Sequence, residues 1–317
     1  MPELPEVEYT ARQLRASVVG KTIQDAAVLW ERTIGHPDLA DFLAEIAGRT
    51  IEGVRRRGKF LLLDLSGNLF LSVHRRMTGN FLLLPVGWEI DTHLRETDLA
   101  TWNVKGPVFK ETEPPADRSI SVATRPITLS QTFYCRVCLN FTDGERLLFT
   151  DPRKFGRVEL WSRDHEDEAF AGLGPEPLDG TFTPEQFTEA LSRRKTAIKP
   201  ALLAQELVVG LGNIYADEAL FYAGLHPLRP ANSLTPKEIR TLHEGIITVL
   251  TNGIEHGGTS FNDYRDLWGE AGDNYNHVLV YQKDGTPCVR CGTAIERIVV
   301  TQRSTHFCPA CQKLRPE

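Results

Sequence analysis

Two stretches in the first fifty residues have hydrophobic positions with helical spacing. Their apolar positions are Val7, Ala11, Leu14 and Val18 in the first stretch and Leu39, Phe42, Leu43 and Ile46 in the second. A spacing of three or four residues places such side chains on one face of a helix. The pattern therefore predicts two amphipathic helices, and residues 22–30 between them have the pattern of a strand.

Between residues 50 and 161 the hydrophobic pattern changes to short runs bounded by turn residues. The runs are Thr50–Val54, Phe60–Leu65, Leu69–Val73, Phe81–Val86, Phe133–Phe141, Arg146–Thr150 and Arg157–Trp161. Ser66-Gly67-Asn68 and Asp143-Gly144 are typical of hairpin turns. Short strands with tight turns predict a β-sandwich or barrel, flanked by the two helices. Residues 87–130 interrupt this pattern with a long, proline-containing insert.

The second half of the chain is predicted to be helical. Gly172–Gly180, which contains two prolines, is typical of a domain linker. Thr183–Gln186 and Thr235–Glu238 then match the capping box that starts a helix, each with flanking hydrophobic residues placed as a staple. The expected fold class is α+β, with modules at 1–171 (including the insert near 87–130), 181–258 and 259–317.

Composition favours a globular protein of more than one domain. The chain has 317 residues, of which 41% are hydrophobic and 25% are charged, enough for two buried cores. No apolar run approaches the length of a membrane span, and the N-terminus lacks a signal-peptide pattern. These features exclude a membrane protein, and we expect a cytoplasmic location, where thiols stay reduced.

The charge distribution permits a nucleic-acid partner. A net charge of −6 argues against a basic coat, but a groove requires only local positive charge. Basic residues cluster at 55–59, 75–76, 153–154 and 193–195, whereas residues 164–168 are mostly acidic. Each basic cluster alone is also compatible with an ordinary solvated face.

Four of the six cysteines have the spacing of a metal site. The spacing is Cys288-x2-Cys291-x16-Cys308-x2-Cys311. Two such pairs predict one tetrahedral Zn²⁺ site, and the site should be structural because four thiolates fill the coordination shell. The remaining cysteines, Cys135 and Cys138, are expected to be buried thiols, with a redox or metal role as the alternative.

The extreme N-terminus combines a potential amine with two carboxylates. Removal of Met1 would make Pro2 the terminal residue and expose a secondary amine, which is nucleophilic when neutral. Glu3 adjoins it and Glu6 lies one helical turn further along, so both could move protons for that amine. The alternative is an ordinary helix start with Pro5 in its first turn.

A glycine turn at Gly210–Tyr215 precedes a helical stretch. It lacks the third glycine and the preceding strand of a dinucleotide-binding motif, which excludes a Rossmann interpretation. Such a turn can instead present backbone N–H groups to a phosphate, with Asn213 adding a side-chain donor. Arg303, near the tip of the predicted cysteine hairpin, could also hold a phosphate. Taken alone, these residues are equally consistent with a tight turn and an exposed arginine.

Ordered motifs along the chain resemble the formamidopyrimidine-DNA glycosylase family. The motifs are P-E-L-P-E-V-E at 2–8, R-R-G-K-F-L-L-L at 56–63, H-R-R-M-T-G at 74–79, D-P-R-K-F-G at 151–156, K-T-A-I-K-P at 195–200, V-V-G-L-G-N-I-Y-A-D-E at 208–218 and Q-R-S-T-H-F-C-P-A-C-Q at 302–312. The resemblance implies an N-terminal β-sandwich, a helix–two-turn–helix module and a C-terminal zinc finger. It also implies a monomer with damaged double-stranded DNA between these modules.

The resemblance further implies an activity and roles for individual residues. The enzyme would be a bifunctional glycosylase and abasic-site lyase of base excision repair, excising oxidised purines through a Pro2 Schiff base and then completing β,δ-elimination. Glu3 would move protons at the sugar, Glu6 would order the terminus, and Lys59 would meet a phosphate. The implied DNA-binding residues are His74, Met77, Arg153, Phe155, Lys195, Asn213, Tyr215 and Arg303.

Met77 and Phe155 are apolar residues within basic strings. This context favours wedges that enter the DNA stack, with ordinary core positions as the alternative. Arg75 and Arg76 stand where the similar family motif H-L-G-M-S-G has Leu-Gly, and they are expected to add charge near the wedge. Two other functions stay open: an endonuclease VIII-like enzyme for oxidised pyrimidines, and a non-catalytic protein that binds damaged DNA. Leu4 favours the purine branch, since the pyrimidine branch usually has glycine there.

Overall fold

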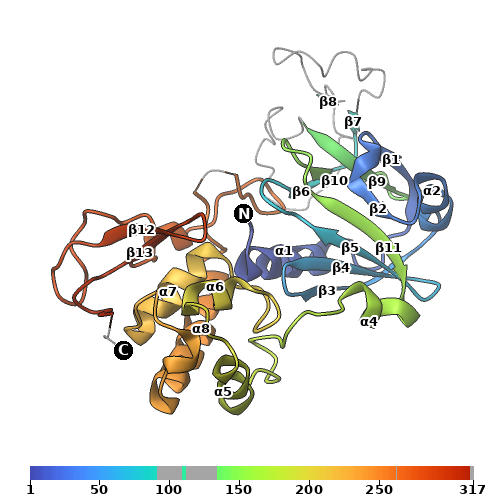
Figure 1. Ribbon diagram of the computed structural model, residues 1–317. Coiled ribbons are helices and arrows are strands. Elements are labelled where there is room, and N and C mark those ends of the chain that lie inside the picture. The colour runs from blue at the N-terminus through green and yellow to red at the C-terminus, as the bar shows by residue number, and fades with distance from the viewer. Residues whose placement is uncertain (91–108, 112–133, 262, 315–317) are drawn as a thin grey trace.

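The computed structural model describes residues 1–90, 109–111, 134–261 and 263–314 of the chain. Figure 1 shows a β-sandwich beside a helical module, with a small two-stranded hairpin packed on the far side of the helices. Most helices thus lie in a part of the molecule separate from the sandwich, which the two N-terminal helices flank. The predicted α+β class is confirmed.

The sandwich consists of a four-stranded and a five-stranded sheet. The first has the order β1 (Ile23–Val28), β9 (Cys135–Phe141), β10 (Arg146–Thr150) and β6 (Asn80–Leu84), and the second has the order β2 (Ile34–His36), β11 (Arg157–Ser162), β5 (Leu69–His74), β4 (Phe60–Leu65) and β3 (Ile51–Arg57). Among these strands, β2 and β11 pair in parallel and the other neighbours are antiparallel. The predicted turns at 66–68 and 143–144 join antiparallel neighbours, so both hairpins are confirmed.

Both predicted N-terminal helices are present and bury the predicted faces. In α1 (Leu4–Val18) the apolar stripe from Val7 to Val18 is buried in the sandwich core, where Phe42 of α2 (Leu39–Ile46) joins it. Leu4, at the start of α1, belongs instead to the core of the helical module. Helix α1 therefore joins the two parts, and Figure 1 places the N-terminus between them.

The helical module contains α5 (Pro184–Ser192), α6 (Ile198–Leu203), α7 (Asn213–Ala223) and α8 (Pro236–Glu255). Thr183 and Thr235 both form the predicted reciprocal capping boxes. Helix α7 is the central element, because α6, α8 and the C-terminal hairpin all pack against it. As a result residues 214–221 are all buried, including the charged Asp217 and Glu218.

The C-terminal hairpin is formed by β12 (Glu296–Val300) and β13 (Arg303–Phe307). It packs on α7 through a small apolar cluster that includes Phe221 and Ile295. Thr301 and Gln302 both adopt positive φ, as a two-residue hairpin turn of this kind requires. The turn leaves Arg303 at the tip, as predicted.

Some predicted strand limits differ from those in the structure. The strand expected from residue 133 begins at Cys135, because Tyr134 has a φ of 74°, outside the extended region. The strand expected over 81–86 runs from Asn80 to Leu84. In the predicted insert, β7 (Trp88–Ile90) pairs with β8 (Phe109–Glu111), and residues 91–108 and 112–130 lie outside the described parts of the chain. Within the described parts, no helix is both long and apolar enough to span a membrane.

Candidate active site and nucleic-acid interface

A cavity of about 280 Å³ lies where the sandwich, the helical module and the C-terminal hairpin meet. Its wall combines the start of the chain, the β3–β4 turn, the start of α7 and the hairpin tip. The predicted site residues that line it are Glu3, Lys59, Met77, Asn213 and Arg303. Residues from both ends of the chain thus converge on one small volume.

The Glu3 carboxylate lies at the N-terminus of α7 and accepts hydrogen bonds from its backbone. Its oxygens accept hydrogen bonds from the N–H groups of Gly212 at 2.7 Å, Ile214 at 2.9 Å and Tyr215 at 3.3 Å. Gly212 allows this approach, since a Cβ there would lie 2.3 Å from the Glu3 carboxyl carbon. These donors stabilise Glu3, which corrects the expectation that the glycine turn offers them to a phosphate. Burial raises the pKa of Glu3, and the nearby positive charge of Lys59 opposes the shift.

Glu6 fixes the beginning of α1. One carboxylate oxygen accepts the Glu3 N–H at 2.6 Å, and the other accepts the Tyr215 hydroxyl at 2.8 Å and the Thr259 N–H at 2.7 Å. Asn274 extends this network by donating to the Thr259 hydroxyl at 2.7 Å. Tyr215 is only 1% exposed. It therefore supports the site from the interior, which corrects its expected place among the DNA-contacting residues.

Pro2 is buried directly before Glu3, whereas Met1 is exposed and lines the cavity. While Met1 is attached, the Pro2 nitrogen belongs to a peptide bond and is not nucleophilic. Removal of Met1 would convert this nitrogen into a secondary amine beside the cavity. Pro2 directly precedes Glu3, whose N–H the Glu6 carboxylate accepts at 2.6 Å.

Lys59 reaches the cavity from the β3–β4 turn, where Gly58 adopts a φ of 55°. Glu176, in the segment that joins the sandwich to the helices, holds this turn. Its carboxylate accepts the Gly58 N–H at 2.6 Å and the Arg57 guanidinium at 3.1 Å. Burial lowers the pKa of Lys59, and the carboxylate of Glu3 opposes the shift. The linker thus positions a buried cation opposite the buried acid.

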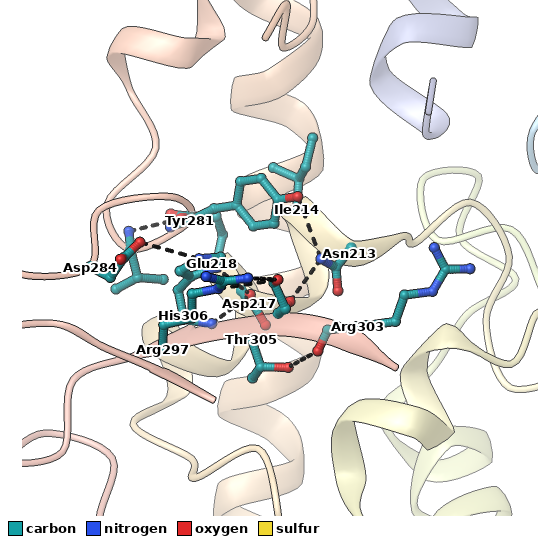
Figure 2. Close-up of polar contacts among 12 residues, drawn as sticks. Asn213, Ile214, Asp217, Glu218, Tyr281, Asp284, Arg297, Arg303, Thr305 and His306 are labelled. Carbon is teal, nitrogen blue, oxygen red and sulfur yellow. Dashed lines mark hydrogen bonds and ion pairs between the residues drawn. The ribbon is translucent and has the colours of Figure 1, made fainter. Parts of the chain in front are cut away.

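Asn213 and Arg303 approach the cavity from different elements. The Asn213 amide nitrogen donates to the Ser304 carbonyl at 2.8 Å. Its amide oxygen is buried, with no hydrogen-bond partner in the described structure. Figure 2 shows the Arg303 guanidinium extending to the same side as the Asn213 amide. The Arg303 guanidinium can donate to a phosphate as it stands, whereas Asn213 could do so only with its amide turned over, because its amide nitrogen already donates to Ser304.

Lys199 is a buried cation that the sequence interpretation did not select as a site residue. Its ammonium pairs with Asp217 of α7 at 2.6 Å and donates to the Ser304 carbonyl at 3.1 Å. Asp217 also accepts the His306 N–H at 2.9 Å (Figure 2). The pair fastens β13, and with it Arg303, to α6 and α7. The available sequence signal was a lysine among the apolar residues of a short helix.

His74 and Lys195 do not contribute to the cavity wall. Lys195 is exposed in the loop before α6. His74 ends β5, packs edge-on against Phe60 with ring centres 4.7 Å apart, and accepts the Arg76 N–H at 3.0 Å. Burial lowers the pKa of His74 to about 3, so its ring is neutral near pH 7. Because the ring is neutral, it would contact a charged group of DNA through a hydrogen bond and not as a cation.

The two candidate wedge residues lie on loops that share one carboxylate. Asp151, which is fully buried, accepts the Arg153 N–H at 3.1 Å, the Phe155 N–H at 2.7 Å and the Thr78 hydroxyl. Phe155 is 51% exposed, and the Arg153 guanidinium lies 4.9 Å from its ring centre. Met77 is half-buried in the cavity wall. The alternative that both are core residues is therefore wrong.

Arg75 and two cysteines are buried away from this surface. Arg75 is 1% exposed, which corrects the expectation that it adds charge near the wedge, whereas Arg76 is exposed. Cys135 and Cys138 are free thiols within β9, and burial raises the pKa of Cys138 to about 12. Both cysteines have the buried, protonated character expected of structural thiols.

The four cysteines of the C-terminal hairpin form one metal site. Their sulfur atoms lie within 4.8 Å of one another, with Cys288 and Cys311 3.9 Å apart and Cys291 and Cys308 3.5 Å apart. A tetrahedral Zn²⁺ with Zn–S bonds of about 2.3 Å requires sulfurs about 3.8 Å apart. The donor set fits one structural Zn²⁺, and four thiolates complete its coordination.

Family comparisons cover most of the chain. The formamidopyrimidine-DNA glycosylase N-terminal domain matches residues 1–158, and the formamidopyrimidine-DNA glycosylase H2TH domain matches residues 173–265. The zinc finger found in FPG and IleRS matches residues 285–314. Formamidopyrimidine-DNA glycosylase of Enterococcus faecalis is 41% identical, over 99% of this chain and 98% of its own. The corresponding protein of Herpetosiphon aurantiacus is 42% identical, over 98% of this chain and 100% of its own.

Solved structures of a Lactococcus lactis relative have the same fold. A mutant of that FPG bound to Fapy-dG-containing DNA superposes with a TM-score of 0.80 at 34% identity, over 99% of this chain and 100% of that one. The wild-type protein bound to DNA containing an oxidised pyrimidine gives a TM-score of 0.79 at 34% identity, with the same coverage. Both solved structures are complexes with damaged DNA.

Proposed function

The chain belongs to the formamidopyrimidine-DNA glycosylase family, and we propose that it excises oxidised purines, namely 8-oxoguanine and formamidopyrimidines, and then cleaves the abasic site. The observation that carries this proposal is the position of Pro2, buried beside Glu3 and Glu6 at the edge of a cavity that Lys59 also lines. A nucleophile, a proton-transfer group and a cation are thereby held within one site.

The proposed reaction begins after Met1 has been removed. The Pro2 nitrogen attacks C1′ of the damaged nucleoside, the C1′–N bond to the base breaks, and the departing base takes up a proton. Opening of the sugar ring gives an iminium between Pro2 and C1′. Loss of a proton from C2′ then breaks the C3′–O bond, and a second elimination breaks the C5′–O bond. Water finally hydrolyses the imine and frees the amine.

Glu3 is the proposed proton-transfer residue. Burial raises the pKa of Glu3 and so favours its protonated form, and its contacts with the start of α7 hold the carboxyl group in one orientation. Glu6 would position the terminus through its bond to the Glu3 N–H. Lys59, on the opposite wall, would contact the lesion's phosphate.

Damaged double-stranded DNA is the proposed partner of a monomer, with the nucleotide flipped out of the duplex. C1′ is not accessible to an enclosed amine while the base is stacked, so extrusion must precede attack. Asn213 and Arg303 would hold backbone phosphates, whereas Met77 and Phe155 would fill the space left in the duplex. Arg153, stacked on Phe155, would face the unpaired opposite base.

Borohydride trapping tests this proposal directly. Reduction of the iminium in the presence of an 8-oxoguanine duplex should give a stable protein–DNA adduct, which intact mass and peptide mapping should place on the N-terminal peptide. Protein that retains Met1 is the matched control and should give no adduct. A trapped adduct on Lys59 with Pro2 unmodified would refute the mechanism.

A second candidate substrate class is the oxidised pyrimidines. The Lactococcus lactis relative has been solved with DNA that contains such a lesion, so a pocket of this fold admits a smaller ring. Excision rates measured in parallel on 8-oxoguanine and oxidised-pyrimidine duplexes separate the two classes. We expect the purine substrate to react faster, since Leu4 stands where the enzymes for oxidised pyrimidines usually have glycine.

A further inference from the structure

Residues 263–270, here called the bridging segment, belong in sequence to the C-terminal half but are bound to the N-terminal sandwich. Leu267 is fully buried in the sandwich core and its carbonyl accepts the Leu83 N–H at 3.4 Å. Gln13 of α1 donates to the Asp266 carboxylate at 2.8 Å and accepts the Leu267 N–H at 2.9 Å. The segment therefore spans from one module to the other beside the cavity.

The bridging segment and residues 75–79, here called the Met77 loop, line the same cavity. Met77 and Tyr264 both contribute to its wall. The two loops are joined by Asn80, whose amide donates to the Asp263 carbonyl at 2.7 Å and accepts the Arg265 N–H at 3.0 Å. A shift of either loop would therefore alter the contacts of the other.

Arg75 is the largest fully buried side chain of the described structure, and its guanidinium lies at this junction. Its nitrogens donate to the Gly79 carbonyl at 2.7 Å, to the Thr10 hydroxyl at 2.9 Å and to the Asn80 amide oxygen. A further bond reaches the Arg265 carbonyl at 3.3 Å, and the Tyr264 ring centre is 5.1 Å away. One planar cation thus contacts α1, the Met77 loop and the bridging segment.

The hydrogen-bond acceptors around this junction suit an arginine better than a lysine. Guanidinium has five N–H donors in a fixed plane, so it can bond to oxygens on three segments at once, whereas a lysine ammonium is a compact point charge. Burial lowers the pKa of Arg75, and the charges of Glu6 and Asp266 are among the influences that oppose this shift. A buried cation of this kind is costly unless its donors are satisfied.

We propose that Arg75 is a positioning residue that couples the Met77 loop to the bridging segment. This contact keeps Met77, which would enter the duplex, in a fixed position relative to the cavity wall that would receive the displaced base. The inference rests on the proposed function for its effect on catalysis. The coupling of the two loops is a property of the free protein and can be measured without any substrate.

The test uses Arg75→Leu, which introduces an apolar side chain, as in the similar family motif, and removes every donor. Amide hydrogen exchange should become faster in peptides that cover residues 263–270. Single-turnover excision of an intact lesion should slow by about tenfold to a hundredfold, the loss expected when a group is misplaced by about 1 Å. Cleavage of a preformed abasic site, which needs no displaced base, should change by less than about threefold.

Two further variants separate positioning from general loss of stability. Arg229→Leu removes another buried arginine, paired with Glu238 at 2.6 Å within the helical module. It should lower the melting temperature yet leave both the exchange of residues 263–270 and the ratio of the two rates unchanged. Arg75→Lys, which keeps the charge, should reproduce the faster exchange and the altered rate ratio, because one ammonium cannot reach all three segments.

The possible failures can be told apart. Unchanged exchange in residues 263–270, with both rates reduced equally, would show that Arg75 only stabilises the fold and would overturn the inference. A wild-type exchange pattern and rate ratio in Arg75→Lys would also overturn it, because charge alone would then suffice. Absence of excision and abasic-site cleavage in the wild-type protein would refute the proposed function, while the exchange experiment would still decide whether the loops are coupled.

Discussion

At the scale of single residues, Glu3 is subject to two opposing influences. Backbone donors at the start of α7 and the charge of Lys59 stabilise its carboxylate, but burial disfavours the charge more strongly and raises the pKa of Glu3. The folded protein therefore binds this proton more tightly than the unfolded chain does. The stability that Glu3 contributes is present at acid pH and is lost as the pH rises through the raised value.

Replacing Glu3 with glutamine should change both the pH dependence of stability and the rate of excision. The stability of wild-type protein minus that of Glu3→Gln should decrease as the pH rises from about 4.3, the ordinary value for glutamate, toward neutrality. Excision by the variant should be slow throughout. Melting curves of both proteins across this range provide the measurement. A difference that increases with pH would show that the α7 donors outweigh burial.

Phe155 offers a second test at this scale. Because its ring is half-exposed, Phe155→Ala should change the free energy of unfolding by only about 0.5 kcal/mol, as is usual for surface positions. Loss of stacking is worth about 1–3 kcal/mol per base, so excision of an intact lesion should slow by about tenfold or more. A preformed abasic site should be affected less. Equal losses on both substrates together with a lower melting temperature would indicate a packing role instead.

At the scale of elements, local patterns predicted most of the structure correctly. The capping boxes at Thr183 and Thr235, the turns of the sandwich and the helical stripe after Val7 depend on neighbours within a few residues, so the sequence contains the information that determines them. The metal site could be predicted for the same reason, because the spacing of the four cysteines along the chain defines it directly.

Contacts between elements could not be predicted in the same way. A glycine turn before a helix predicts free N–H donors, but the sequence does not say that Glu3 occupies them. Arg75 follows a strand and precedes a turn, a position typical of an exposed arginine, yet the distant oxygens of Thr10 and Arg265 hold it inside together with its own loop. In both cases the deciding group is distant in sequence, so periodicity carries no information about it.

The zinc-binding hairpin should act as a unit in DNA binding. Metal binding in such modules is worth about 10–16 kcal/mol of folding free energy, so Cys308→Ser should unfold the hairpin. Arg303 and the Ser304 carbonyl that holds Asn213 would then be displaced. We expect DNA affinity to fall sharply while the sandwich stays folded, measured by binding assays and circular dichroism. Absence of zinc in metal analysis of freshly purified protein would contradict this account.

At the scale of the whole molecule, α1 makes the two large modules interdependent. Leu4 is fully buried in the helical core while Val7, less than one turn further, is buried in the sandwich core. Leu4→Ala should destabilise the protein by about 2–5 kcal/mol and should also reduce excision, because the cavity adjoins Glu3. Leu191→Ala creates a comparable cavity in the same helical core, on α5, which packs against α8, and is the matched control.

The two variants should therefore differ in activity when compared at equal stability. Calorimetry measures the stability of each variant, and single-turnover kinetics measures its rate of excision. If Leu191→Ala impairs excision as much as Leu4→Ala does, the connection through α1 has no particular importance for the site.

The burial of Pro2 also limits when the active protein can be made. The carboxylate of Glu3 bonds to Gly212, a residue 209 positions later, so the N-terminus cannot be enclosed until that part of the chain has been synthesised. At about 5–20 residues per second this interval lasts roughly 10–40 s. During it the Met1–Pro2 bond is open to an aminopeptidase, and after folding Pro2 is buried. We therefore expect Met1 to be removed fastest during translation, although Met1 itself stays exposed after folding, and a chain that keeps Met1 should stay inactive.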